Sequence, residues 1–137
     1  MLQINNRERE ELLHFACKNG QISLIRNLLK DNVDINALNA KGLSPLHLAV
    51  IEGNIEVTKL LISEGANIEV TDSKWGSSPL LYACQNGRTK IVKLLVEMGA
   101  DIKAESDDDT SAIHFAAQSG KSDLIDFLLQ KILSLEV

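Results

Sequence analysis

The three histidines and two cysteines are the side chains of this sequence with the widest chemical use, because both types bind metal ions or take part in catalysis. The histidines His14, His47 and His114 recur at steps of 33 and 67 along the chain, and Cys17 and Cys84 are also 67 apart. A metal site needs ligands that converge within a few ångströms, and a catalytic cysteine needs a base beside it. These regular, wide spacings indicate instead that each set occupies one position of a repeating unit, with the cysteines in a small, semi-buried slot.

Two shorter motifs resemble ligand-binding loops, but each lacks residues that such a loop requires. Gly120-Lys121-Ser122 has the ending of a phosphate-binding loop, but that loop requires a glycine where this chain has Phe115. Four of the five residues 105–109 are acidic, but a calcium-binding EF-hand loop would need glycine and glutamate where the sequence has Ala112 and Gln118. We interpret the first motif as a turn between helices and the second as a solvated acidic loop. The sequence therefore predicts no enzyme activity, no cofactor and no metal site.

The elements that would position these residues repeat along the chain. Gly20, Gly53, Gly87 and Gly120 recur at steps of 33, 34 and 33. The alanines at 16, 49, 83 and 116 keep the same steps. One extra residue is therefore inserted within 71–76. A period of this length is typical of a solenoid, in which each unit buries its apolar face only against its neighbours.

Each unit contains the signals of two short helices. In the second unit, Ser44-Pro45 supplies a hydroxyl N-cap followed by proline at the first helical position, and Gly53 ends the helix. Apolar residues at helical spacing over 55–62 predict a second helix, which ends at Gly65.

These segments resemble the ankyrin repeat. The resemblance rests on Ser44-Pro45-Leu46-His47-Leu48-Ala49, on Ser78-Pro79-Leu80-Leu81-Tyr82-Ala83, and on the pairs Gly65-Ala66 and Gly99-Ala100, and it covers roughly 8–129. It implies an all-α fold, an ankyrin-repeat solenoid of stacked helix–turn–helix units with short β-hairpin fingers. We expect one domain over 1–137, with units at about 7–37, 38–70, 71–104 and 105–137. In this family the repeated histidine hydrogen-bonds at the start of the first helix, and Leu81 replaces it in the third unit.

Composition narrows the choice of partner. The 137 residues carry 14 basic and 19 acidic side chains, for a net charge of −5, and only 4% are aromatic. An acidic balance and few aromatic side chains disfavour direct binding to nucleic acid. We find neither a signal peptide nor an apolar run long enough to cross a membrane. The sequence therefore predicts an intracellular protein, cytoplasmic or nuclear, without membrane contact.

The resemblance implies that another protein binds on the concave face, which is lined by the fingertips and the exposed ends of the first helices. The partner-binding residues predicted there are Lys41, Leu43, Ile51, Glu52, Lys74, Trp75, Ser77, Gln85, Asn86, Asp107 and Asp108. Trp75 is the leading candidate, because it lies in the finger with the inserted residue and tryptophan is enriched at interface hot spots. In the alternative interpretation, Trp75 lies flat against its own finger as packing. The acidic last finger fits a partner with a basic segment.

The predicted function is a non-catalytic protein–protein interaction module that acts as an adaptor, scaffold or inhibitor and is a monomer when unbound. The alternatives are a regulatory subunit of a nucleic-acid-associated complex and a self-associating module. The charged residues 7–11 are expected to cap the first unit. The apolar tail, 132–137, either folds back on the last helices or forms a sticky surface, and the helix before it is expected to run on because Ile132 replaces a terminating glycine.

Overall fold

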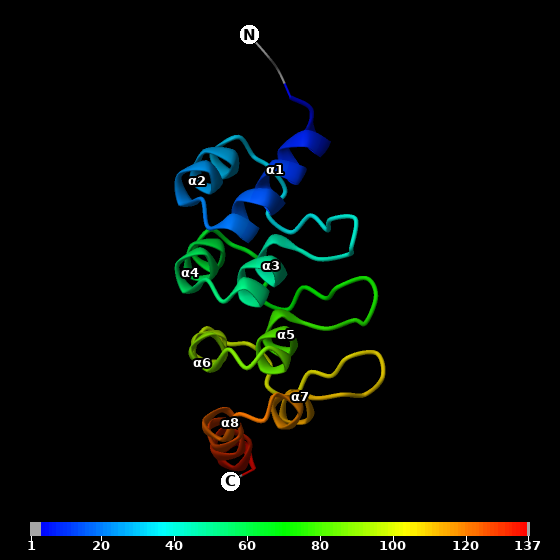
Figure 1. Cartoon of the computed structure of the whole chain (residues 1–137), viewed down its shortest axis with the longest axis vertical. Coiled ribbons are helices and arrows are strands. Elements are labelled where there is room, and N and C mark those ends of the chain that lie inside the picture. The colour runs from blue at the N-terminus through cyan, green and yellow to red at the C-terminus, as the bar shows by residue number, and fades with distance from the viewer. Residues whose placement is uncertain (1–3, 137) are drawn as a thin grey trace.

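A computed structural model describes residues 4–136, which form a stack of helix pairs (Figure 1). The first helices of the four pairs are α1 (Asn6–Asn19), α3 (Pro45–Glu52), α5 (Pro79–Gln85) and α7 (Ala112–Ser119). The second helices are α2 (Ile22–Lys30), α4 (Ile55–Ser63), α6 (Thr89–Glu97) and α8 (Ser122–Leu135). Each predicted unit thus holds one helix pair, and the all-α solenoid fold is confirmed. The exact unit boundaries stay predictions.

The helices form two columns, with α1, α3, α5 and α7 in one and α2, α4, α6 and α8 in the other (Figure 1). Each first helix contacts the next first helix along the stack. The repeated alanines, among them Ala49 and Ala83, are completely buried there, because a larger side chain would hold the helices apart. Leu61 and Leu95 of the second helices join the same continuous core. In the part of the chain that the structure describes, no helix is both long and apolar enough to cross a membrane.

The start of α3 confirms the role expected of the repeated histidine. The Ser44 hydroxyl accepts a hydrogen bond from the His47 backbone N–H, and His47 Nδ1 accepts one from the Ser44 N–H at 3.1 Å. At the start of α7, His114 Nδ1 likewise accepts a hydrogen bond from the Ser111 N–H at 3.1 Å. At the equivalent position of α5, Leu81 is buried by apolar packing.

The loops before α3, α5 and α7 are the fingers, here called the first finger (38–43), the second finger (71–77) and the third finger (105–110). A side-chain oxygen organises each turn. Asn39 Oδ1 accepts backbone N–H bonds from Lys41 and Leu43, and Asp72 and Ser106 act in the same way in the other two. Within residues 4–136, the only β pairing is an isolated bridge between 105 and 111. The fingers are thus tight turns rather than paired strands, because side-chain acceptors take the place of a hydrogen-bond ladder.

The inserted residue lies in the second finger. One backbone hydrogen bond closes the first finger between Asn39 and Leu43, whereas the bond that closes the second joins Asp72 and Ser77, which enclose one residue more. The extra residue therefore lies between Asp72 and Ser77, which agrees with the insertion that the repeat spacing predicted within 71–76. Backbone bonds also join neighbouring fingers, from Ser73 N–H to the Gly42 carbonyl and from Asp107 N–H to the Trp75 carbonyl.

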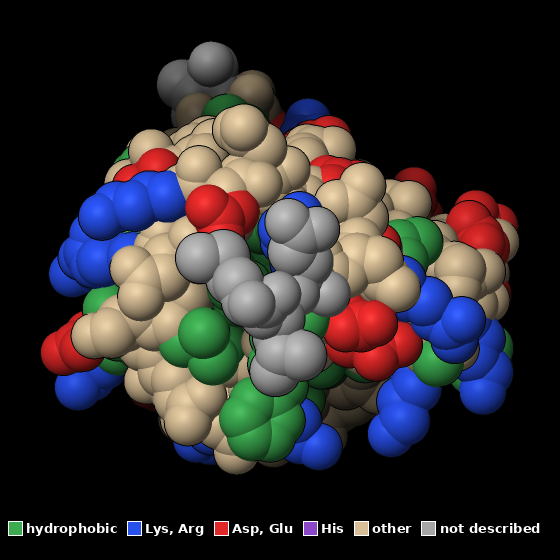
Figure 2. Space-filling model, turned by 90° about the horizontal axis from the view of Figure 1, so that it is seen from above, with side chains coloured by type: hydrophobic (Ala, Val, Ile, Leu, Met, Phe, Trp, Pro, Cys, Tyr) green, Lys and Arg blue, Asp and Glu red, His purple; other side chains and the backbone are tan. Residues whose placement is uncertain are grey.

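The two ends of the stack differ. At the N-terminal end, Asn5 caps α1 by accepting the Glu8 N–H, and Figure 2 shows acidic and basic side chains interspersed there with apolar ones. At the other end, α8 runs on to Leu135 as expected. Leu133 and Leu135 are 61% and 57% exposed, so the described tail continues outward instead of folding back. Val137 lies outside the described residues.

Candidate binding surface

The surface between the fingers and the first helices, here called the concave face, contains two hollows. The N-terminal hollow has a volume of about 720 Å³ and is formed by α1, the first finger and α3. Phe15 and Leu38, which line it, are 54% and 44% exposed, although such large apolar side chains are usually buried. Four predicted residues, Lys41, Leu43, Ile51 and Glu52, line the same hollow.

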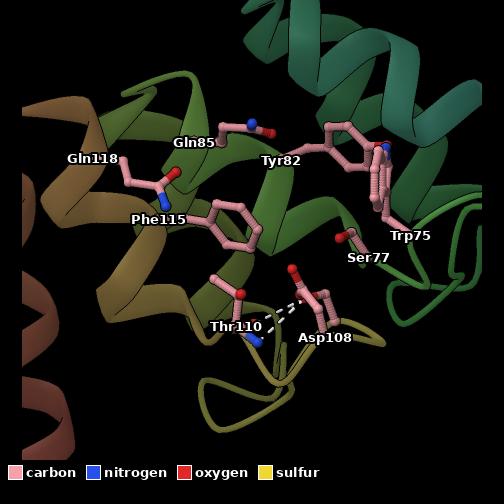
Figure 3. A pocket seen from close by; sticks show the side chains of 9 residues that line it. Trp75, Ser77, Tyr82, Gln85, Asp108, Thr110, Phe115 and Gln118 are labelled. Atoms are coloured by element: carbon pink, nitrogen blue, oxygen red, sulfur yellow. Dashed lines mark hydrogen bonds between the residues drawn. The ribbon is translucent and has the colours of Figure 1, made fainter.

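The C-terminal hollow has a volume of about 460 Å³ and lies between the second and third fingers and helices α5 and α7. Figure 3 shows the rings of Trp75 and Tyr82 on one side, Phe115 across from them, and Asp108 on the third finger. Four predicted residues, Trp75, Ser77, Gln85 and Asp108, belong to its lining. The two hollows follow one another along the same face of the stack.

The predicted residues differ in exposure and in whether they line a hollow. Trp75 is 53% exposed, whereas Ser77 is only 4% exposed. The Ser77 backbone N–H donates to Asp72 and its carbonyl accepts from His47, so Ser77 serves the scaffold and has little side-chain surface to offer a partner. The predicted residues that line neither hollow are Lys74, Asn86 and Asp107, all of which are exposed.

Sequence reasoning missed a row of large side chains on this face. Phe15, Leu48, Tyr82 and Phe115 occupy one repeat position, the residue just before the repeated alanine, and each lines one of the two hollows. We call these four residues the concave row. The signal was present, because three of the five aromatic side chains fall at this single position. It was overlooked because residues that repeat in register were assigned to the scaffold.

A buried carboxylate fixes the finger that carries Trp75. Asp72 is 4% exposed and accepts backbone hydrogen bonds from Ser77 at 2.7 Å, Trp75 at 3.1 Å and Lys74 at 3.2 Å. Burial alone would raise the pKa of Asp72, but these bonds and one from the Tyr82 hydroxyl outweigh it and hold that pKa below its usual value. Burial, together with the charge of Asp72, raises the pKa of Tyr82 to about 12. Asp72 is therefore charged and Tyr82 neutral at physiological pH.

Among residues 4–136, no three His, Cys, Asp or Glu side chains gather closely enough to hold a metal ion. Cys17 and Cys84 are free and completely buried, and burial raises the pKa of each thiol to about 12. The folded protein therefore holds both sulfur atoms as thiols, whereas the thiolate is the reactive form.

Comparisons with known proteins agree with the architecture. A family model described as three copies of ankyrin repeats matches residues 2–72 and again 64–136. The Notch-regulated ankyrin repeat-containing protein of Xenopus laevis is 28% identical over 120 residues, which cover 85% of this chain and 75% of that protein. The human transient receptor potential cation channel subfamily A member 1 is 38% identical over 64 residues, or 44% of this chain. The Arabidopsis thaliana potassium channel AKT1 is 37% identical over 62 residues, or 43% of this chain.

The matched segments span only 6% of the human channel and 7% of the plant channel, so this chain corresponds to a small part of those proteins. The relatives share the repeat rather than any one activity, and ankyrin repeats generally serve as protein–protein interaction modules. The family model covers nearly the whole sequence, and the structure has the stacked helix pairs that the resemblance implied. The chain belongs to the ankyrin-repeat family.

Proposed function

We propose that this protein binds a segment of another protein along the concave face and acts, without catalysis, as an adaptor, scaffold or inhibitor. The observation that carries the proposal is the coincidence of exposed apolar side chains with hollows. Phe15, Leu38 and Trp75 are 54%, 44% and 53% exposed. Phe15 and Leu38 line the N-terminal hollow, and Trp75 lines the C-terminal hollow. Exposed apolar side chains that gather in this way mark interaction sites.

The rigidity of the face supports the same proposal. The fingers are bonded to one another and to the helices behind them, for example from Asp107 N–H to the Trp75 carbonyl at 2.8 Å. A surface that is ordered before binding loses little conformational entropy when the partner arrives. We therefore expect recognition without folding of this chain, with a partner segment that spans the two hollows.

The test compares proteins captured from a cell lysate by three versions of the full chain. The double variant Ile51→Ala/Trp75→Ala changes one side chain in each hollow, and Met98→Ala changes an exposed apolar residue that lines neither. We expect one set of proteins to bind the wild type and Met98→Ala but not the double variant. The same captured set with all three folded proteins would contradict binding on the concave face.

A second candidate function, self-association, rests on the exposed end of α8. Leu129, Leu133 and Leu135 are 44%, 61% and 57% exposed, and they lie within one helix. Light scattering over a concentration series tests this candidate. A mass that rises with concentration, and falls back in a Leu133→Lys variant, would support it, whereas a constant monomer mass would exclude it.

A further inference from the structure

We propose that the C-terminal hollow binds an arginine side chain of the partner, which would be held between the aromatic rings and paired with Asp108. This inference rests on the proposed function and specifies the chemistry of one of its two hollows. The observation behind it is that the stacking of two adjacent units brings aromatic and acidic side chains into one hollow. Trp75 and Tyr82 come from the third unit, and Phe115 and Asp108 come from the fourth (Figure 3).

The three rings supply a surface that attracts a cation. Aromatic faces carry negative electrostatic potential, and Trp and Tyr faces bind guanidinium groups better than other uncharged side chains do. The Trp75 ring already attracts one cation, since Lys74 Nζ lies 5.1 Å from the ring centroid. Lys74 is not part of the lining, so the hollow itself contains no basic side chain.

The third finger supplies the matching negative charge. Asp108 accepts a hydrogen bond from the Ser106 hydroxyl, which orients the carboxylate, and this bond holds the pKa of Asp108 below its usual value. Asp107 and Asp109 extend the acidic surface beside it and are both exposed. The Asp107 N–H also donates to the Trp75 carbonyl at 2.8 Å, so the backbone fixes the acidic finger beside the aromatic one.

The remaining lining favours arginine over lysine. Gln85 and Gln118 bring side-chain amides to the wall opposite the fingers, and their oxygens can accept further N–H bonds (Figure 3). A guanidinium group presents five N–H donors in one plane and stacks on aromatic rings, whereas an ammonium group is a compact, strongly hydrated charge. A hollow that is lined by aromatic rings and by side-chain acceptors therefore suits the planar group better than the ammonium group.

The test titrates the full-length protein with N-acetyl-arginine methylamide, followed by NMR of the backbone and side-chain amides. The matched probe is N-acetyl-citrulline methylamide, which has the same shape without the charge, and a lysine probe tests the geometry. We expect the arginine probe to shift signals of Gln85, Gln118 and Trp75, to bind more tightly than both other probes, and to weaken at high salt. Equal binding of the citrulline or lysine probe would overturn the assignment, as would the absence of any shift at the solubility limit of the arginine probe.

Variants assign the effect to individual side chains. We expect Trp75→Ala to weaken the arginine probe about two- to fivefold, the range of a cation–π contact at an exposed site, and Trp75→Phe to weaken it less. Asp108→Asn should also weaken it, whereas Lys74→Ala should strengthen it by removing a competing cation. Met98→Ala, which changes an exposed apolar residue that lines neither hollow, is the control and should leave the affinity for the arginine probe unchanged. Unchanged affinity in folded Trp75→Ala and Asp108→Asn would refute the proposal.

The probe titration and the lysate capture can fail independently of each other. If the double variant Ile51→Ala/Trp75→Ala loses its captured proteins while the arginine probe fails to bind, the concave face is the binding site but its C-terminal hollow has another occupant. If the probe binds as expected while capture is unchanged, the hollow recognises arginine and the concave-face function is wrong.

Discussion

His47 and Ser77 join two adjacent units through one hydrogen bond, in which His47 Nε2 donates to the Ser77 carbonyl oxygen at 2.9 Å. The Ser44 N–H donates to Nδ1 of the same ring, so the neutral tautomer with its proton on Nε2 satisfies both bonds. The residue that starts α3 thus also holds the end of the second finger, which carries Trp75. His47 is completely buried, and this arrangement requires it to be uncharged.

Acidification should destabilise the fold through His47. Burial lowers the pKa of His47 below its ordinary value of 6.5, although the bond to Ser77 and the charge of Asp72 act in the opposite direction. As pH falls below about 6.5, the unfolded chain binds the proton before the folded chain does, so the free energy of unfolding decreases. We expect the thermal midpoint, followed by circular dichroism, to fall between pH 7 and pH 5. His47→Leu, which copies Leu81, should flatten this slope, and an unchanged slope in that variant would show that another group is responsible.

Removal of the Asp72 carboxylate should destabilise the second finger. Asp72→Ala leaves the backbone N–H groups of Lys74, Trp75 and Ser77 without their acceptor, which we expect to cost about 1–3 kcal/mol of unfolding free energy. Asp72→Asn should cost less, because Asn39 performs the same role in the first finger. Urea denaturation measures both, and equal losses for the two variants would argue against the acceptor role.

Alanine at Gly42 should be more damaging than alanine at Gly120. Both glycines have positive φ, at 80° and 73°, which costs a residue with a Cβ about 1–2 kcal/mol. At Gly42 the new Cβ would also meet the Ser73 side chain and lie 3.1 Å from the Ser73 backbone nitrogen, whereas at Gly120 it would meet nothing. The midpoint of urea denaturation should therefore fall further for Gly42→Ala. Equal midpoints would mean that the first and second fingers are not packed as described.

The two thiols should be unreactive until the protein unfolds. Burial raises the pKa of both Cys17 and Cys84 to about 12, so the thiolate is scarce at pH 8 and the sulfur atoms are out of reach. We expect a disulfide reagent such as dithionitrobenzoate to react at the rate of unfolding in buffer and rapidly in denaturant. Rapid modification of the native protein would contradict the buried placement of these cysteines.

Local signals in the sequence determined the helices, their order and the repeat. Ser44-Pro45 marks the start of α3 and Gly53 marks its end, because helix capping depends on the few residues at each helix end. The repeat spacing located the inserted residue within 71–76, because a change in period is visible without coordinates. The missing glycine at Ile132 likewise predicted the extension of α8.

Only the tertiary structure decided which side chains meet across units. Ser77 has the sequence context of a surface turn, yet it is buried because His47, thirty residues earlier, bonds its carbonyl. Phe115 and Asp108 reach the same hollow as Trp75 because adjacent units stack in register and a backbone bond links their fingers. The capping signals that fix a helix act within a few residues, but a hollow between units depends on how those units pack, which no single segment specifies.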